Sequence, residues 1–421
     1  MYQRFVLDNG IRVFVNELPH TRSATVSVYV RTGSRYEPNR IAGISHFIEH
    51  MLFKGTEKRP AAQDIATAIE GIGGAFNAST GHEYTNYWVK VTFQHFDVAL
   101  DVLSDMLRYS LLAPAEIEKE RRVIIEEIMQ TFDTPDELVF FDLDALMWPA
   151  HPLGRDIAGT PESVAGLTRR QMCDYMGQHY YAGNVVISAA GLMQTDVVLP
   201  RIADAFKDLP AGKSPGYRGF KVSQRTPRWN LRYKKTEQAH VAVSTWSYPR
   251  LHPDRFVINV LHGILGDGMS SRLFQEIREK QGLAYSVSSF GGAHDDCGHF
   301  GSYAAVEPKK AAIALKAMLG EWARLREEPV AADELSKAKE LIKGHFLLSM
   351  EDTHSIAGWY GRQEIMGHEI LTVDQVSAAI DAVTTEDVQR VSRDLFRKNW
   401  LNLSVVGPFR GDGPFAQALD L

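Results

Sequence analysis

The chain has 421 residues, too many for one ordinary domain, which favours two domains of about 200 residues each. Hydrophobic residues make up 44% of the sequence and charged residues 23%, as in globular proteins that fold in water. The formal net charge is −6 and no block of lysine and arginine stands out, so a nucleic-acid-binding surface is not expected.

The cysteines and the apolar runs indicate the compartment. Cys173 and Cys297 are the only two cysteines, one in each half, which predicts no disulfide framework and favours a reducing compartment. The first residues lack the basic and apolar runs of a signal peptide, and no apolar segment approaches the roughly 20 residues needed to span a bilayer. We therefore expect a cytoplasmic protein without a membrane span.

The N-terminal part predicts β structure followed by helices. Residues 4–17 alternate around Asp-Asn-Gly, a strong signal for a hairpin turn, and residues 24–31 form a second alternating, valine-rich run. A helix is expected at residues 43–53. A short helix through Ile65 and Ile69 then ends at the glycine cluster of residues 71–74.

The helix at residues 43–53 carries the strongest chemical signal. Residues three and four apart share one face of a helix, so His46, Glu49 and His50 project together. Two imidazoles one turn apart can clamp a divalent metal ion, and the carboxylate beside them can take a proton from metal-bound water. The order H-x-x-E-H is the inverzincin signature, the reverse of the commoner H-E-x-x-H.

A catalytic zinc site needs a third protein ligand and leaves its fourth position to water. Residues 117–128 predict a charged helix in which Glu127 lies 77 positions beyond His50. Glu120 lies seven positions before Glu127, two turns back on nearly the same face. Glu126 is the alternative ligand, because a shift of one residue in register would exchange it with Glu127.

Together these segments resemble the pitrilysin / mitochondrial-processing-peptidase family, which has a His-x-x-Glu-His motif and a ligating Glu further along the chain. The resemblance implies one Zn²⁺ per chain, bound by His46, His50 and Glu127. It implies that Glu49 is the general base and that Glu120 supports catalysis. The implied activity is that of a zinc metalloendopeptidase, a hydrolase that cleaves short or unfolded polypeptides.

Residues 75–91 form a β-rich run. In the family the matching segment is an edge strand beside the metal, where the substrate is added as a further strand through main-chain hydrogen bonds. Asn77 and Ala78 match the positions that contact the substrate. The alternative is a half-buried strand without a ligand.

The first half continues with helices and one buried strand. Apolar spacing predicts helices at residues 96–107, 136–147 and 168–180, and residues 184–190 predict a buried strand. Residues 209–216 have the composition of a linker.

After the linker the pattern returns. Residues 168–191 and 384–407 share a helix, a strand and a final glycine at an offset of 216 residues, and Gly-x-Ser recurs at residues 268–270. The predicted fold is therefore α+β, with two homologous domains that each have helices packed on a mostly antiparallel sheet, as in the family. The expected boundaries are 1–208 for the zinc-binding domain, 209–225 for the linker and 226–421 for the second domain. The residues that replace His46, Glu49 and His50 in that domain have no metal-binding pattern: Ser271, Phe274 and Gln275.

The second half contains one further pair with a family counterpart. Arg278 and Tyr285 resemble an Arg and a Tyr that steady the substrate backbone and the oxyanion. The alternative is an exposed helical Arg and a strand Tyr in the core. Residues 294–299, His-Asp-Asp-Cys-Gly-His, lie between two β-type runs and are explained better as a polar hairpin loop than as a second metal site.

The resemblance also bears on partners. Family chains of this length form half of a closed chamber and act as dimers. Because this chain carries both the zinc motif and the Arg/Tyr pair, a homodimer is the simplest assembly, and a heterodimer with an inactive relative is the alternative. Arg278 and Tyr285 then serve the zinc of their own chain or that of the partner. Two other functions remain open, a non-catalytic structural subunit and a metal hydrolase that is not a peptidase.

Overall fold

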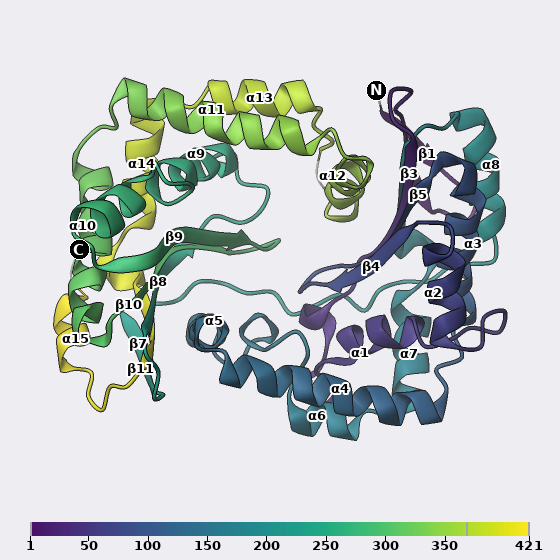
Figure 1. The fold of residues 1–421 in the computed structure, drawn as a ribbon, viewed down its shortest axis with the longest axis horizontal. Helices are drawn as coiled ribbons and strands as arrows, with labels where there is room; N and C mark the ends of the chain where they lie inside the picture. The colour runs from purple at the N-terminus through teal and green to yellow at the C-terminus, as the bar shows by residue number, and fades with distance from the viewer. Residues whose placement is uncertain (1, 368, 420–421) are drawn as a thin grey trace. The chain divides into compact units, whose positions relative to one another are not determined.

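The computed structural model describes residues 2–367 and 369–419, which form two compact units of sheet and helix (Figure 1). Unit 1 comprises the chain up to Met129 together with Arg155–Arg218 and Ser349–Ile370. Unit 2 comprises Gln130–Gly154, Gly219–Leu348 and the chain from Leu371 onward. Each unit thus contains one helical segment from the other half of the sequence, whereas the predicted domains were contiguous.

The sheet of unit 1 has six strands in the order β1-β2-β6-β3-β5-β4. Only the pair β2–β6 is parallel. The predicted hairpin is confirmed, since β1 and β2 pair in antiparallel register and Gly10 between them has a φ of 93°. In chain order the strands are β1 (Tyr2–Val6), β2 (Arg12–Glu17), β3 (Ser23–Val30), β4 (Ala75–Thr80), β5 (Thr85–Thr92) and β6 (Val185–Gly191).

The helices of unit 1 cover this sheet and supply the segment with the H-x-x-E-H motif. The predicted helices around residues 43–53, 96–107 and 168–180 are all present, with small shifts at their ends. They are α1 (Ile44–Leu52), α2 (Ala62–Glu70), α3 (Phe96–Tyr109), α4 (Pro114–Asp133), α6 (Pro161–Gly166), α7 (Arg169–His179), α8 (Thr195–Phe206) and α12 (Thr353–Ile365).

The sheet of unit 2 has five strands in the order β7-β11-β8-β10-β9, again with one parallel pair, β7–β11. This order matches β2-β6-β3-β5-β4 strand by strand. β2 begins at Arg12 and β7 at Arg228, and β3 begins at Ser23 and β8 at Ala239, an offset of 216 residues in both cases. The predicted pair of homologous domains is therefore confirmed.

The remaining elements of unit 2 pack around its sheet. Residues 209–225, the predicted linker, form neither helix nor strand. The strands are β7 (Arg228–Tyr233), β8 (Ala239–Ser247), β9 (Ala284–Ala293), β10 (Gly298–Val306) and β11 (Asn402–Gly407). The helices are α5 (Pro135–Met147), α9 (Arg255–Leu265), the π-helix η6 (Phe274–Lys280), α10 (Ala311–Glu327), α11 (Ala332–Ser349), α13 (Val373–Asp381), α14 (Thr385–Leu395) and α15 (Gly413–Ala418).

Two helices, α5 and α12, each belong to the unit formed mainly by the other half of the sequence, so neither unit is contiguous along the chain. α12 packs on β3 and β6 of unit 1, where Ala357 and Ile365 are buried with Phe14 and Val186. α5 packs on β8 and β11 of unit 2, where its apolar face joins a core that contains Trp246. The helix predicted at residues 136–147 is present as α5, but apolar spacing does not specify which sheet a helix packs on.

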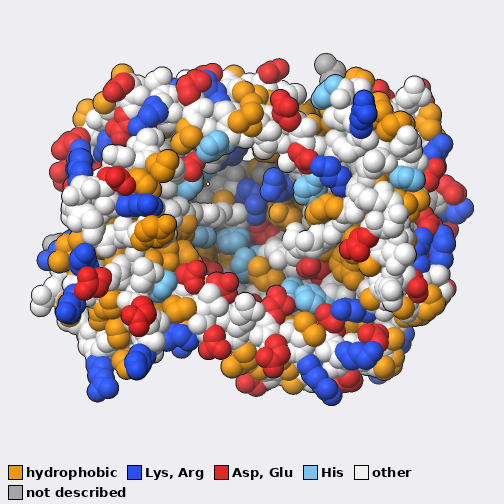
Figure 2. Space-filling model, in the orientation of Figure 1, with side chains coloured by type: hydrophobic (Ala, Val, Ile, Leu, Met, Phe, Trp, Pro, Cys, Tyr) orange, Lys and Arg blue, Asp and Glu red, His pale blue; other side chains and the backbone are white. Residues whose placement is uncertain are grey.

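The surface is mixed in charge. Lys and Arg side chains alternate with Asp and Glu over the face in Figure 2, in agreement with a sequence that has no basic block. No helix in the described part of the chain has the length and apolar character needed to cross a membrane.

Candidate metal centre

The start of α1 is defined by two backbone requirements. Gly43 has a φ of 89°, and a Cβ at this position would lie 2.2 Å from the carbonyl oxygen of Ala158, so only glycine fits. The buried carboxylate of Glu37 accepts the backbone N–H groups of Gly43 and Ser45, each at 2.8 Å. Burial raises the pKa of Glu37, and these hydrogen bonds oppose the rise. A carboxylate thus caps the helix end where the dipole is positive.

The apolar side of α1 holds the helix in the core. Phe47, Ile48 and Met51 have no exposed surface. The end of the helix packs beside β4, where Phe53 contacts Phe76 with ring centroids 5.6 Å apart. The opposite side of α1, with the two histidines and Glu49, is thereby presented by a rigid element.

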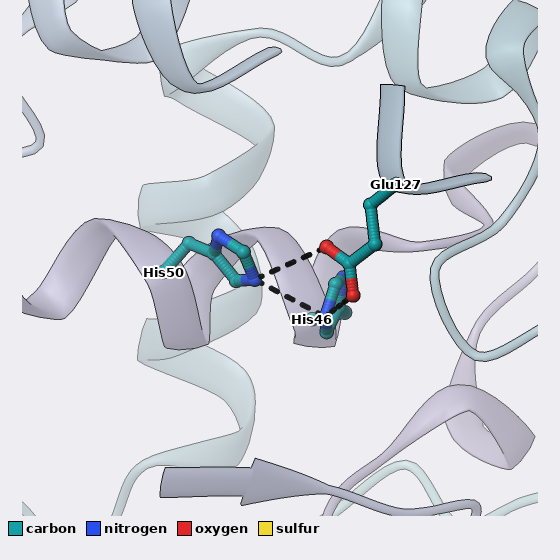
Figure 3. Close-up of side chains that lie close together, drawn as sticks. All are labelled: His46, His50 and Glu127. Atoms are coloured by element: carbon teal, nitrogen blue, oxygen red, sulfur yellow. Dashed lines mark hydrogen bonds and ion pairs between the residues drawn. The ribbon is translucent and has the colours of Figure 1, made fainter. Parts of the chain in front are cut away.

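Three side chains converge on one point (Figure 3). His46 and His50 extend from neighbouring turns of α1, and their Nε2 atoms are 3.2 Å apart. Glu127 of α4 approaches from the other side, with Oε1 3.6 Å from His46 Nε2 and Oε2 3.7 Å from His50 Nε2. Within the described residues, these three form a group with ligand atoms near enough to hold one metal ion. Glu127, and not Glu126, is the α4 carboxylate in this group.

The spacing of the ligand atoms fits zinc. Zinc bonds to nitrogen and carboxylate oxygen are about 2.0–2.2 Å long, so the ligands of a tetrahedral ion lie about 3.3–3.6 Å apart. The observed separations of 3.2, 3.6 and 3.7 Å are close to this range. Burial lowers the pKa of His46 to about 4, which keeps this imidazole neutral and its lone pair available at neutral pH. The residues present therefore fit a zinc ion with three protein ligands.

A buried carboxylate orients His50. Glu120 of α4 lies with Oε1 2.8 Å from His50 Nδ1, while its Oε2 is 2.6 Å from Lys54 Nζ. An ionised carboxylate only accepts hydrogen bonds, so Nδ1 carries a proton and Nε2 is the nitrogen left to bind a metal ion. Burial alone would lower the pKa of His50, but the hydrogen bond and charge of Glu120 outweigh it and raise the pKa. Conversely, burial would raise the pKa of Glu120, and its contacts with His50 and Lys54 lower it.

Glu49 and Glu127 are both less acidic than ordinary carboxyl groups. Burial raises the pKa of Glu49, although the hydroxyl of Thr80 donates a hydrogen bond to its carboxylate and opposes the rise. Burial also raises the pKa of Glu127; the charge of His50 opposes the rise, and those of Asp156 and Glu120 add to it. A raised pKa makes a carboxylate a stronger base than an ordinary one, as a general base requires.

Thr80 belongs to β4, the edge strand of the sheet, which pairs only with β5. Asn77 is exposed on this strand, and its side-chain Oδ1 accepts the backbone N–H of Ala78 at 2.8 Å. The Ala78 N–H therefore points away from β5 toward the free edge of the sheet. Such an edge is a template for a further strand. The role of Asn77 and Ala78 in substrate binding stays a prediction.

Arg278 and Tyr285 lie together in unit 2. The Arg278 guanidinium lies over the Tyr285 ring, 4.6 Å from its centroid, and Nη1 donates to the Tyr285 carbonyl oxygen at 2.9 Å. Tyr285 is 75% exposed, which contradicts the alternative of a core tyrosine. Arg278 is part of a π-helix, a rare conformation that is frequent at functional sites.

Residues 294–297 form the loop between β9 and β10, while Gly298 and His299 begin β10. The His294 N–H donates to the Cys297 carbonyl oxygen at 2.7 Å. This geometry is that of a hairpin connection, as the sequence predicts.

Comparison with known proteins decides the family. The profile described as "Insulinase (Peptidase family M16)" matches residues 12–161, and the profile described as "Peptidase M16 inactive domain" matches residues 166–342. The chain belongs to peptidase family M16. An uncharacterised zinc protease of Streptomyces coelicolor is 37% identical over 414 residues, which cover 97% of this chain and 90% of that relative.

Two further comparisons extend over nearly the whole chain. The mitochondrial-processing peptidase subunit beta of Dictyostelium discoideum is 32% identical over 414 residues, covering 96% of this chain and 88% of that protein. The crystal structure of a protease from Helicobacter pylori shares the fold with a TM-score of 0.93 at 22% identity, covering 97% and 99% of the two chains. The resemblance to the pitrilysin / mitochondrial-processing-peptidase family is thus confirmed.

Three residues that contact α1 or its side chains were not predicted. Glu37 caps α1 from six positions before Gly43, a spacing that matches no local capping pattern. Lys54 follows α1 and reaches Glu120, which is distant in sequence. Thr80 could have been found from the alternation of the β-rich run, because it shares a face with Ala78.

Proposed function

We propose that the protein is a zinc metalloendopeptidase that hydrolyses peptide bonds of short or unfolded polypeptides. The observation that carries the proposal is the convergence of His46, His50 and Glu127 at zinc-ligand separations, with Glu49 one residue before His50 on the same helix. Family membership supports the same chemistry, because the curated relative from Streptomyces coelicolor is named a zinc protease.

Each site residue of unit 1 has a distinct part in the proposed reaction. A bound zinc ion would supply a Lewis acid and a water whose pKa is lowered to about 7. Glu49 takes the proton of the attacking water and returns it to the leaving amine, a contribution of about a hundred- to ten-thousandfold. Thr80 keeps the Glu49 carboxylate in place through its hydroxyl. Glu120 holds His50 in the tautomer that presents Nε2 as a ligand.

The free edge of β4 suggests how the substrate binds. An extended polypeptide can pair with this edge through main-chain hydrogen bonds, with Asn77 and Ala78 among its contacts. A folded protein has few segments free to adopt this conformation. The proposal therefore restricts the substrates to short or unfolded chains.

Arg278 and Tyr285 are proposed to stabilise the oxyanion that forms as the carbonyl carbon is attacked. The exposed Tyr285 phenol and the Arg278 guanidinium stacked on it form a compact pair of hydrogen-bond donors. We propose a homodimer, with a heterodimer that contains an inactive relative as the alternative, and a cytoplasmic location. A dimer made of one Glu49→Gln chain and one Arg278→Ala chain would distinguish the two arrangements, because one complete site remains only if the partner donates Arg278.

The test compares one polypeptide in folded and unfolded form as substrate. We expect cleavage of the unfolded form only, abolished by a chelator and restored by Zn²⁺. Zinc binding without cleavage, in the presence or absence of candidate partner chains, would favour the alternative of a non-catalytic structural subunit. Cleavage that persists in chelator would contradict the zinc mechanism.

A further inference from the structure

Lys54 stands directly behind the proposed metal centre. It follows α1 by two positions and lies four positions after His50. Its Nζ atom is 2.6 Å from Glu120 Oε2, and its side chain is 28% exposed, whereas the Glu120 side chain is only 7% exposed. The contact is therefore a charge pair at the edge of the interior, with its acidic member buried.

The two oxygens of Glu120 have different partners. Oε1 contacts His50 Nδ1 at 2.8 Å and Oε2 contacts Lys54 Nζ. A carboxylate held at both oxygens cannot rotate about its last bond without losing one contact. Lys54 therefore determines which way Oε1 points, and through it the orientation of the His50 ring.

The same contact joins the two helices that supply the metal ligands. His50 lies in the last turn of α1 and Lys54 two residues after its end, while Glu120 lies in α4 two turns before Glu127. Clamping Glu120 between Lys54 and His50 fixes α4 against α1 at this point. The clamp thus also bears on the position of the third ligand.

A lysine near a divalent cation has an opposing effect. Its positive charge repels the ion, so removal of the charge alone would strengthen zinc binding. In this site the Glu120 carboxylate lies between Lys54 and the His50 ring and compensates the ammonium charge. The orienting effect and the repulsive effect therefore predict changes of opposite sign when Lys54 is replaced.

We infer that Lys54 is a positioning residue of the metal centre, acting through Glu120 to orient His50 and to hold α4 in register with α1. The inference rests on the proposed function, because it takes His46, His50 and Glu127 as the zinc ligands. It assigns Lys54 no contact with the substrate or with the metal ion.

The test is the zinc dissociation constant of the full chain, measured by competition with a chromophoric chelator. Lys54→Met should weaken zinc binding about tenfold, at the lower end of the range for residues that support metal ligands. Lys54→Arg, which restores a cation that can pair with Glu120, should bind zinc within about twofold of the wild type. Lys58→Met is the matched control, since Lys58 pairs with Asp101 at the surface and should leave the constant unchanged.

A double-mutant cycle separates positioning from a general structural effect. Glu120→Gln should weaken zinc binding about 10- to 100-fold, and adding Lys54→Met to it should cause little further loss. Equal losses from Lys54→Met in both backgrounds would overturn the inference, because Lys54 would then act independently of Glu120. Tighter zinc binding by Lys54→Met would also overturn it, in favour of simple charge repulsion.

Two further controls keep the outcome decisive. If Lys54→Met does not fold, Lys54→Gln keeps a hydrogen-bond donor without the charge and should show a smaller loss of affinity. If the wild type binds zinc and both Lys54 variants bind it with the same dissociation constant, the inference is overturned but the proposed function is not. A wild-type protein that binds no zinc would overturn the proposed function and the inference together.

Discussion

The two units of the chain repeat one sheet topology but differ in the segment that follows the Gly-x-Ser sequence. Both segments begin at a glycine with positive φ, Gly43 at 89° and Gly268 at 80°. In unit 1 the segment is the α-helix α1, whereas in unit 2 it leads into the π-helix η6. The positions of unit 2 that correspond to His46, Glu49 and His50 are occupied by Ser271, Phe274 and Gln275, which offer no set of metal ligands. The comparison teaches that the fold was duplicated while the geometry for a metal was kept in one copy.

The units also differ in how tightly the segment is attached. The Glu37 carboxylate caps α1, and Gly43 lies against the Ala158 carbonyl. Gly268 has space around it, since an added Cβ would come no closer than 3.7 Å to Leu341. A metal centre needs its ligands held rigidly, and the first unit has the additional contacts that do so.

The largest expected effect comes from the residue that makes unit 1 reactive. Glu49→Gln should lower kcat about a hundred- to ten-thousandfold while one zinc per chain is retained, because Glu49 is proposed as a base and not as a ligand. Peptide cleavage and metal content of the same preparation would test this. Loss of zinc from the variant would contradict the assignment.

A second prediction concerns Glu127, the proposed third zinc ligand of unit 1. Glu127→Gln should weaken zinc binding by more than about a hundredfold, because it removes a ligand and not only a supporting group. Glu126→Gln is the matched control, since this neighbouring carboxylate is not in the group of ligand atoms. Chelator competition would measure both constants, and the opposite pattern would shift the ligand register by one residue.

Replacing Gly43 or Gly268 by alanine tests how tightly the start of each segment is constrained by its surroundings. Gly43→Ala should lower the free energy of unfolding by about 3–4 kcal/mol, from left-handed strain plus a clash with the Ala158 carbonyl. Gly268→Ala meets only the strain and should cost about 1–2 kcal/mol. Denaturant unfolding of the metal-free variants would compare them. Equal losses would mean that the two segments are equally constrained.

In their response to acid the units should behave alike. Burial lowers the pKa of His179 in unit 1 and of His299 in unit 2 to about 4. The unfolded chain, with histidine pKa values near 6.5, then binds more protons than the folded chain between about pH 6.5 and pH 4. Stability should therefore fall as the pH falls through this window, by about 3 kcal/mol for each histidine.

The measurement is denaturant unfolding of the metal-free protein at several pH values, with His179→Phe and His299→Phe as comparisons. Each substitution should flatten the pH dependence by a similar amount. A stability that is independent of pH between 6.5 and 4 would contradict the burial of neutral imidazoles.

Much of the metal centre could be predicted because its information is local. The spacing of His46, Glu49 and His50 depends only on the helical period, and apolar neighbours such as Phe47 indicate which side is buried. The repetition of one domain in the two halves followed from the offset of 216 residues between matching segments. The position of Glu127 required the resemblance to a family, since no local rule relates α4 to α1.

What could not be predicted depends on contacts between distant segments. The sequence predicts a helix at residues 136–147, but only the folded chain reveals that α5 and α12 each cover the sheet of the other half. Lys54 and Glu37 look like ordinary charged residues until the folded chain brings Glu120 and the start of α1 beside them. The π-helix of residues 274–280 has no signal in hydrophobic periodicity.

The most direct test of the central claim, that one of the two repeated units holds the metal, is the number of zinc ions per chain. Elemental analysis of the protein purified without added metal, and of His50→Ala prepared in parallel, would provide it. The account predicts about one zinc per wild-type chain and none in the variant. Two zinc ions per chain, none in the wild type, or one retained by His50→Ala would contradict it.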